Sequence, residues 1–593
     1  MSRVLLCLVG STILPLLAVS AADKPTKSTK PTKPDAATSP AMVDKTPKPT
    51  STPGVDKSTL SLVSDTTPAR DPKPLATEID RWVGAGLAKA KLSAAPVIAD
   101  GEFLRRTALH LIGRVPTEEE LDAFLASTEP DKRERWVNDL LASPAYGEHF
   151  ATIWHELMVP VDNALKKPAR DPFTPWLAAQ FNANRGWDAI VRDLLTAEGR
   201  MREVPAAGFI LANSESSEPL PNLLADATAR LFWGVQLRCA ECHDHPYAPW
   251  KQADFWGVAA FFGRLHKGYL EGKNPIGWTL TEAMEDVPSG LGKIPGSEMR
   301  APLDAGAAVR VPETGRKMAG QLVQARFLGG ATPAWKDPGP YRPRFAEWAT
   351  GAEHPWFARN AVNRLWSHFF TRGLVIPLDG QHESAEASHP ELLVALAREF
   401  SASGFNVKQL IRSICASQAY QRNSRPAPGT ELDETWFSHH RPRVMRAEVL
   451  YDSLSVVLQP PFRKGGGKPG TKVELARAQP ISGLSRDEFV RAFATRPDEN
   501  HGSTVNEGIP QLLELMNGRL LADLQAAAGR VTKAGAAQEE IIARVYRLAY
   551  TRTPSAEEQA WVKDYFASHP NPTDACAGLL WTLLNSGEFV TNH

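Results

Sequence analysis

The stretch that decides how this chain is organised runs from Arg230 to Phe262 and reads R-L-F-W-G-V-Q-L-R-C-A-E-C-H-D-H-P-Y-A-P-W-K-Q-A-D-F-W-G-V-A-A-F-F. At its centre, Cys239, Cys242 and His243 form a Cys-x-x-Cys-His pentapeptide. Because the two cysteines are three positions apart, one helical turn can present both sulfurs together, with an imidazole directly after them.

This spacing is typical of c-type haem attachment. In that interpretation, Cys239 and Cys242 hold the porphyrin covalently and His243 is the proximal ligand of the iron. The alternative is that the cysteine pair forms a small disulfide or holds a structural metal, with His243 merely adjacent.

The next residues help to separate haem from zinc. A zinc site would need His245 beside the other three side chains, yet closed zinc sites generally draw their ligands as two pairs from separate segments. Pro246 also disfavours the helical region for His245. We therefore expect Asp244 and His245 to lie beside the ligands, where His245 orients its neighbours or meets substrate. Candidates for a sixth iron ligand are His155, His266 and Met158.

Length and charge set broad limits. A chain of 593 residues is too long for one core and should divide into two or three domains. Lys+Arg and Asp+Glu are equal at 67 each, so no basic surplus predicts binding to nucleic acid.

The N-terminus predicts export. Arg3 precedes an apolar run from Val4 to Leu17, and small residues follow, so residues 1–22 read as a secretory signal peptide. No later segment reaches roughly eighteen uninterrupted apolar residues, so no transmembrane segment is expected after signal removal. The expected location is the periplasm, the cell envelope or the medium.

Residues 23–74 are rich in Lys, Pro, Thr and Ser and almost lack large apolar residues. Such a segment cannot bury a core, so we predict a disordered linker that proteases cut first and that can associate with the cell envelope.

The remaining sequence predicts a mainly α fold, namely two helical domains with a small β-rich or irregular insert between them. Apolar residues recur at helical spacing from Leu75, which gives a helical domain over 75–266 that holds the Cys-x-x-Cys-His motif. One of its helices is expected from Thr174 to Leu195. Frequent Gly and Pro mark the insert over 267–340, and helical patterns resume over 341–593.

Two short patterns recur. R-V-P-T-E-E-E at 114–120 is similar to R-T-P-S-A-E-E at 552–558, and Thr117 with Glu120 predicts a capping box. L-L-A-S-P-A-Y at 140–146 is similar to L-L-N-S-G-E-F at 583–589, with I-C-A-S-Q-A-Y at 414–420 as a third partial copy. The interpretation is a repeated capped-helix unit, and the alternative is coincidence of common capping residues.

Other residues favour structural roles. Cys415 and Cys576 lie in apolar helical surroundings that favour buried free thiols over a disulfide. Five aromatic residues near the motif can wall a haem pocket, although such a stripe is more often plain core: Trp250, Phe255, Trp256, Phe261 and Phe262.

Longer motifs resemble known families. I-D-R-W-V, the segment from Phe103 to Leu121, L-L-A-S-P-A-Y-G-E and C-A-E-C-H-D-H-P-Y resemble the planctomycete cytochrome-like domain of unknown function. N-R-L-W-S-H-F-F-T-R-G-L-V-I-P, S-H-P-E-L-L, R-A-E-V-L-Y-D-S-L and the terminal L-N-S-G-E-F-V-T-N-H resemble the planctomycete-specific C-terminal domain that accompanies it. His368 and His389 are candidate site residues, and Asn363, Arg364 and Arg446 are candidates by this resemblance only. For a single histidine the alternative is a hydrogen-bonded structural imidazole.

The resemblance also bears on partners, because many relatives carry a further cytochrome c domain where this chain has its linker. We therefore expect an exported c-type haem protein that performs electron transfer or haem-dependent redox chemistry on an extracytoplasmic substrate, with an external electron donor or acceptor. The alternative is a non-haem extracellular hydrolase or a carbohydrate- or protein-binding protein. Whether the chain is an enzyme stays open, and an interaction scaffold is a third interpretation.

Overall fold

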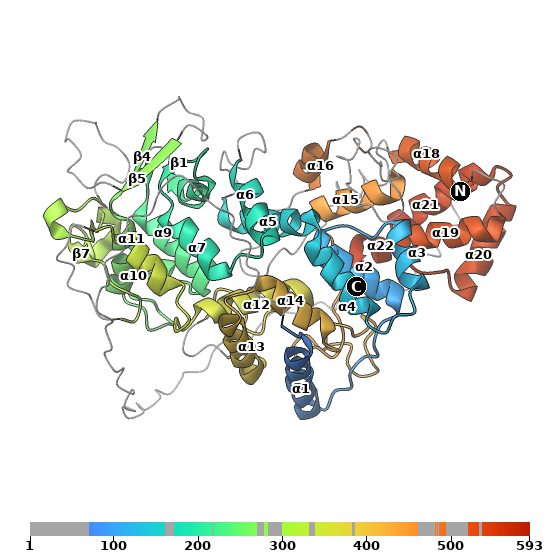
Figure 1. Ribbon diagram of the computed structural model, residues 1–593, viewed down its shortest axis with the longest axis horizontal. Helices are drawn as coiled ribbons and strands as arrows, with labels where there is room; N and C mark the ends of the chain where they lie inside the picture. Colours follow the sequence, from blue (N-terminus) through green and yellow to red (C-terminus); the bar gives the residue numbers. More distant parts are fainter. Residues whose placement is uncertain are drawn as a thin grey trace, which may run out of the picture. The chain divides into compact units, whose positions relative to one another are not determined.

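The computed structural model describes residues 70–160, 171–215, 218–269, 278–282, 299–330, 339–381, 386–459, 481, 483, 485–493, 520–532 and 537–593. The predicted signal peptide and all but the last residues of the predicted linker lie outside this range. The part that is described belongs to one compact unit, Leu62–His593. It is mainly α-helical with short strands, which confirms the predicted fold class (Figure 1).

The helices before the insert are α1 (Lys73–Ala90), α2 (Asp100–Ile112), α3 (Glu118–Ala126), α4 (Lys132–Ala142), α5 (Pro144–Met158), α6 (Phe173–Asn182), α7 (Trp187–Thr196), α8 (Gly208–Ala212), α9 (Pro221–Thr228) and α10 (Gln252–Ala259). Those after it are α11 (Arg342–Ala349), α12 (Phe357–Phe370), α13 (Pro390–Ala402), α14 (Val407–Ala416), α15 (Ala447–Leu458), α16 (Arg486–Phe493), α18 (Leu520–Thr532), α19 (Gln538–Tyr550), α20 (Ala556–Ala567), α21 (Pro572–Leu584) and α22 (Gly587–Val590). Among the described helices, none combines the length and the apolar character that crossing a bilayer requires.

One predicted helix is wrong in its extent. The run from Thr174 to Leu195 is two helices, α6 and α7, because the helical conformation is interrupted between Asn182 and Trp187. Asn184 takes a positive φ of 55°, a conformation that an α-helix does not contain. Arg185 then secures the break by donating to Asp193 of α7 over 2.6 Å.

The predicted insert is small and irregular. Strand β4 (Leu265–Tyr269) pairs antiparallel with β5 (Trp278–Glu282), and β5 pairs with β1 (Gly199–Arg200). A second antiparallel pair joins β6 (Ala308–Arg310) to β7 (Leu322–Gln324). Two further short pairs are β2 (Ser214–Glu215) with β3 (Glu218–Pro219), and β8 (Arg443–Val444) with β9 (Thr591–Asn592).

The buried apolar residues form two clusters. The first extends from Ile79 to Phe437 and includes residues on both sides of the insert. The second is built mainly from residues 445–589, and α2 and the turn after it add Leu109 and Val115. Helix α2 therefore contributes to both cores. The predicted domain boundaries at 266 and 341 stay a prediction.

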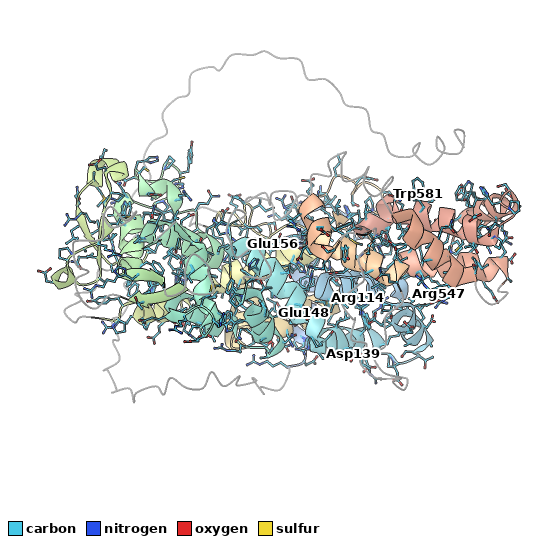
Figure 2. All side chains as sticks on the ribbon, turned by 90° about the horizontal axis from the view of Figure 1, so that it is seen from above. Arg114, Asp139, Glu148, Glu156, Arg547 and Trp581 are labelled. Carbon is cyan, nitrogen blue, oxygen red and sulfur yellow. The ribbon has the colours of Figure 1, made fainter. Side chains whose placement is uncertain are left out.

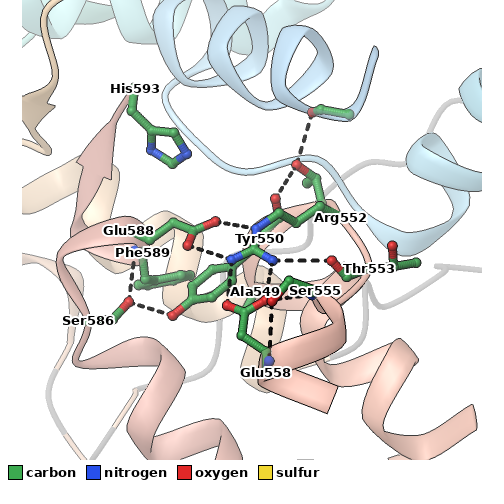
Figure 3. Close-up of polar contacts among 12 residues, drawn as sticks. Ala549, Tyr550, Arg552, Thr553, Ser555, Glu558, Ser586, Glu588, Phe589 and His593 are labelled. Atoms are coloured by element: carbon green, nitrogen blue, oxygen red, sulfur yellow. Dashed lines mark hydrogen bonds and ion pairs between the residues drawn. The ribbon is translucent and has the colours of Figure 1, made fainter. Parts of the chain in front are cut away.

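The repeated pattern has one structure in both copies. Thr117 accepts from the backbone N–H of Glu120 at the start of α3, and Ser555 does the same for Glu558 at the start of α20. In each copy an arginine, Arg114 or Arg552, donates two hydrogen bonds of 2.8 Å to that glutamate. Figure 3 shows the second copy, in which Arg552 also bonds Glu588. The capping box predicted at Thr117 is confirmed, and the interpretation of the two segments as a repeated unit stays a prediction.

The serine pattern is equally regular. Ser143 caps α5, Ser586 caps α22, and Ser417 accepts from the N–H of Tyr420 after α14. The aromatic residue that ends each copy, namely Tyr146, Phe589 or Tyr420, is fully buried. The serine that begins each copy and the buried aromatic residue that ends it together fix the direction in which the chain leaves the preceding helix.

Candidate functional site

The Cys-x-x-Cys-His motif lies on a loop between α9 and α10. After α9 the helix widens into a π-type turn, η4 (Ala229–Trp233), which ends at Gly234 with φ of 68°. A Cβ at Gly234 would lie 2.5 Å from the side-chain oxygen of Asn360, so only glycine fits here. The chain then enters the 3-10 turn η5 (Arg238–Glu241), which contains the first cysteine.

The inner side of this loop is held by buried groups. Ala240 is fully buried. The backbone oxygen of Glu241 accepts from Gln252 Nε2 at 3.0 Å and from Trp256 Nε1 at 3.1 Å. Asn222 of α9 donates to the carboxylate of the same glutamate at 3.0 Å. Glu241, which precedes the second cysteine, is therefore fixed by side chains from α9 and α10.

Two further contacts fix the part of the loop after the cysteines. Asp244 Oδ1 accepts from the backbone N–H of Gln252 at 2.9 Å, at the first residue of α10. His245 donates its backbone N–H to the oxygen of Trp250 at 2.8 Å. The carboxylate of Asp244 is favourable beside the first residue of α10 because it meets the partial positive charge of that helix N-terminus.

The outer side of the loop carries the predicted ligands. Cys239 is exposed, Cys242 is half-buried and both are unbridged. His243 is exposed, and its Nδ1 lies 2.8 Å from the backbone oxygen of Asp244. A carbonyl only accepts, so Nδ1 carries the proton and the neutral ring has its lone pair on Nε2. This is the arrangement in which an imidazole binds a metal through Nε2.

His245 has the opposite arrangement. Its Nδ1 lies 3.1 Å from the backbone nitrogen of Tyr247 and 2.9 Å from that of Ala248, and both of these groups donate. Nδ1 therefore accepts, and the proton of the neutral ring is on Nε2. His245 thus stabilises the turn before Trp250, and the lone pair of its Nδ1 is used by these hydrogen bonds and is not available to bind an ion.

The described residues contain no group of three or more His, Cys, Asp or Glu side chains arranged to hold a metal ion. The four side chains of the zinc alternative therefore do not form a ready tetrahedron. This observation concerns side-chain arrangement alone, and it leaves the haem interpretation untested.

The three candidates for a sixth ligand lie in different surroundings. His155 is buried in α5, 3.5 Å from Asp171. His266 in β4 bonds Arg300 at 2.8 Å, and Met158 is buried in the first core. His155 and Met158 are three residues apart on α5, and the role of each candidate as an iron ligand stays a prediction.

The aromatic residues near the motif are plain core, as the alternative expected. Trp250 is 6% exposed, and the other four are more deeply buried: Phe255, Trp256, Phe261 and Phe262. Trp250 stacks edge-on against Trp356. Cys415 and Cys576 are free and buried, which confirms that prediction.

The residues named by resemblance in the helical motif after the insert hold the backbone. Asn363 bonds both the N–H and the oxygen of Val375, at 2.9 and 3.0 Å. Arg364 donates to the oxygen of Arg230, at 2.7 Å. His368 Nε2 lies 2.9 Å from the oxygen of His110, and His389 bonds Ser388 at 3.1 Å. These two histidines fit the alternative of hydrogen-bonded structural imidazoles.

The fifth residue named by resemblance, Arg446, lies among carboxylates. It pairs with Glu156 of α5 and, at 2.8 Å, with Glu448 of α15. Glu148 and Glu156 are both residues of α5, eight positions apart (Figure 2). Asp452, one turn beyond Glu448, pairs with Arg486 at 2.9 Å. The charged residues of R-A-E-V-L-Y-D-S-L thus join α15 to α5 and α16.

Sequence reasoning missed a row of four histidines in the same region. Ring centroids lie 6.1 Å apart for His149 and His368, 5.3 Å for His368 and His110, and 5.9 Å for His110 and His440. Burial lowers the pKa of His149 to about 3 and that of His368 to about 4. Their sequence separation conceals the row.

Comparison with known protein families finds two matches along the chain. Residues 78–267 match PSCyt2, described as a protein of unknown function (DUF1549), and residues 341–566 match PSD1, described likewise (DUF1553). A match to PSCyt2 is thus followed along the chain by a match to PSD1, which confirms the resemblance. No curated protein and no solved structure matches the chain.

Proposed function

We propose that this chain is an exported c-type haem protein that holds haem through Cys239, Cys242 and His243 and exchanges electrons with an external donor or acceptor. The observation that supports this most is the division of the motif loop into two sides. Its inner residues are bonded to α9 and α10, while Cys239 and His243 are exposed and Cys242 is half-buried.

The chemistry of the donors fits the group. Thioether formation adds a thiol S–H across a vinyl C=C, so one C–S and one C–H bond form and no electrons leave. Such an addition needs reduced thiols, and Cys239 and Cys242 are unbridged. Bound haem would supply a reversible one-electron couple of the iron.

The role of His243 follows from its proton. Its Nδ1–H is fixed on the backbone oxygen of Asp244, which keeps the neutral ring in the tautomer that has its lone pair on Nε2. An exposed imidazole of this kind can serve as proximal ligand without any change in the loop. His245 differs because its Nδ1 accepts two backbone hydrogen bonds.

The test is the absorption spectrum of the protein exported by a host with c-type maturation machinery. We expect a Soret band that survives acid-acetone extraction, and a mass increase of one haem on the peptide that contains Cys239 and Cys242. Cys239→Ser and Cys242→Ser should each abolish or cripple attachment. The matched control is Cys576→Ala, because that thiol is buried in the second core. A colourless wild-type protein from this host refutes the proposal.

A further inference from the structure

Between the two cysteines the chain has one carbonyl that receives two side-chain donors. The oxygen of Glu241 accepts from Gln252 Nε2 and from Trp256 Nε1, at 3.0 and 3.1 Å. Gln252 and Trp256 are four residues apart, so they lie on the same face of α10. Trp256 is fully buried and Gln252 is 5% exposed.

This carbonyl belongs to the peptide bond that joins Glu241 to Cys242. Because a peptide unit is planar, fixing its oxygen also fixes the nitrogen and the Cα of Cys242. The two donors therefore limit how the second cysteine and His243 can turn relative to Cys239. Asn222 restrains the same residue from α9 through its carboxylate, at 3.0 Å.

A porphyrin ring is rigid, so two thiols react with its vinyl groups together only when their separation is right. A loop that is already ordered loses less conformational entropy when it meets such a partner. The donors of α10 are well suited to provide this order, because a buried N–H that lost its acceptor would be costly.

We propose that Trp256 and Gln252 are positioning residues for haem attachment, which hold the Glu241–Cys242 peptide so that Cys239, Cys242 and His243 face one cofactor. This inference rests on the proposed function. It assigns no contact between either residue and the haem, and it goes beyond the Cys-x-x-Cys-His motif because both residues lie in the following helix.

The experiment uses the full chain exported by a maturation-competent host. Trp256→Phe removes the indole N–H and keeps an aromatic core residue, and Gln252→Leu removes the amide. The matched control is Trp233→Phe, because Trp233 is also fully buried and donates its indole N–H elsewhere, to the oxygen of Ala349 at 3.1 Å. Circular dichroism and thermal melting establish that each variant is folded.

Two quantities are measured. The first is the fraction of chains with covalent haem, by mass spectrometry of the denatured protein. The second is the rate at which iodoacetamide labels Cys242 in protein made without maturation machinery. We expect each α10 variant to lower the haem occupancy and to raise the labelling rate of Cys242 about fivefold, because each removes one hydrogen bond of about 1 kcal/mol. Both quantities should be unchanged in Trp233→Phe.

The outcomes separate the two proposals. A loaded wild type with equally loaded and equally labelled α10 variants overturns the positioning role and leaves the proposed function standing. Equal losses in Trp256→Phe and Trp233→Phe also overturn it, because general loosening of the core then explains the effect. A wild type without covalent haem overturns both proposals. Should Trp256→Phe fail to fold, Gln252→Leu decides the question alone.

Discussion

Arg106 of α2 donates its Nε–H to the backbone oxygen of His593, at 3.0 Å, across 487 positions of sequence. The same guanidinium also donates to the oxygens of Tyr420 and Arg422, at 2.6 and 2.9 Å. Its neighbour Arg105 donates to the oxygens of Ala549 and Phe589. Two adjacent buried arginines thus bond α2 to the backbone oxygens of three segments that are distant in sequence.

Arg106→Leu should lower the free energy of unfolding by about 3 kcal/mol, because it leaves several buried carbonyls without donors. Chemical denaturation of the full chain at pH 7 measures this loss. The control is Arg81→Leu, whose guanidinium pairs with Glu78 on the surface and should cost less than about 1 kcal/mol. Equal effects of the two substitutions would contradict the role assigned to Arg106.

Glu558→Gln should weaken the second capped-helix unit at pH 7 by about 1 kcal/mol. The hydrogen bonds from Arg552 are the largest cause that lowers the pKa of Glu558 to about 2. A carboxylate whose folded pKa is lowered stabilises the protein above its usual value of 4.5, and this contribution is lost as the pH falls from there towards 2. Wild type and variant should therefore converge in acid. Glu557→Gln, an exposed neighbour, should show no such dependence.

The histidine row predicts a second, independent effect of acid. Burial is the largest cause that lowers the pKa of His149 to about 3 and that of His368 to about 4. The unfolded chain therefore binds protons first, and stability falls as the pH decreases from about 6.5, by up to about 1.4 kcal/mol per pH unit for each imidazole. Between pH 6 and 4, unfolding free energies of His149→Asn should fall less steeply than those of wild type. An unchanged slope would show that His149 does not contribute.

The two motif histidines should differ in their substitutions. His245→Ala should keep covalent haem and change its spectrum only modestly, because its Nδ1 holds the turn and not a metal. His243→Ala should keep some thioether attachment but lose the proximal bond, which visible spectra of the ferric and ferrous protein detect. One zinc per chain, no iron and equal losses in both variants would refute the haem interpretation in favour of a structural metal.

Local patterns in the sequence were sufficient for the helical class, for the capping box at Thr117 and for the similarity of the segment at 552–558 that forms the same cap. Each of these depends on residues a few positions apart, where spacing and backbone propensity decide the structure. The extent of the helix predicted from Thr174 was wrong because the break at Asn184 is supported by Arg185, whose partner in α7 periodicity does not reveal.

Only the tertiary structure determined which distant groups meet. Nothing local assigns the carbonyls of Tyr420 and His593 to Arg106, or the carbonyl of Glu241 to Trp256. The first core includes residues on both sides of the predicted insert, and α2 adds Leu109 to the second core as well. Burial forces every polar group on such a helix to find a partner, and the partner is whatever segment packing brings within hydrogen-bond distance. The sequence specified the Cys-x-x-Cys-His motif. Packing alone decided that Glu241 is bonded to α9 and α10 while Cys239 and His243 are exposed.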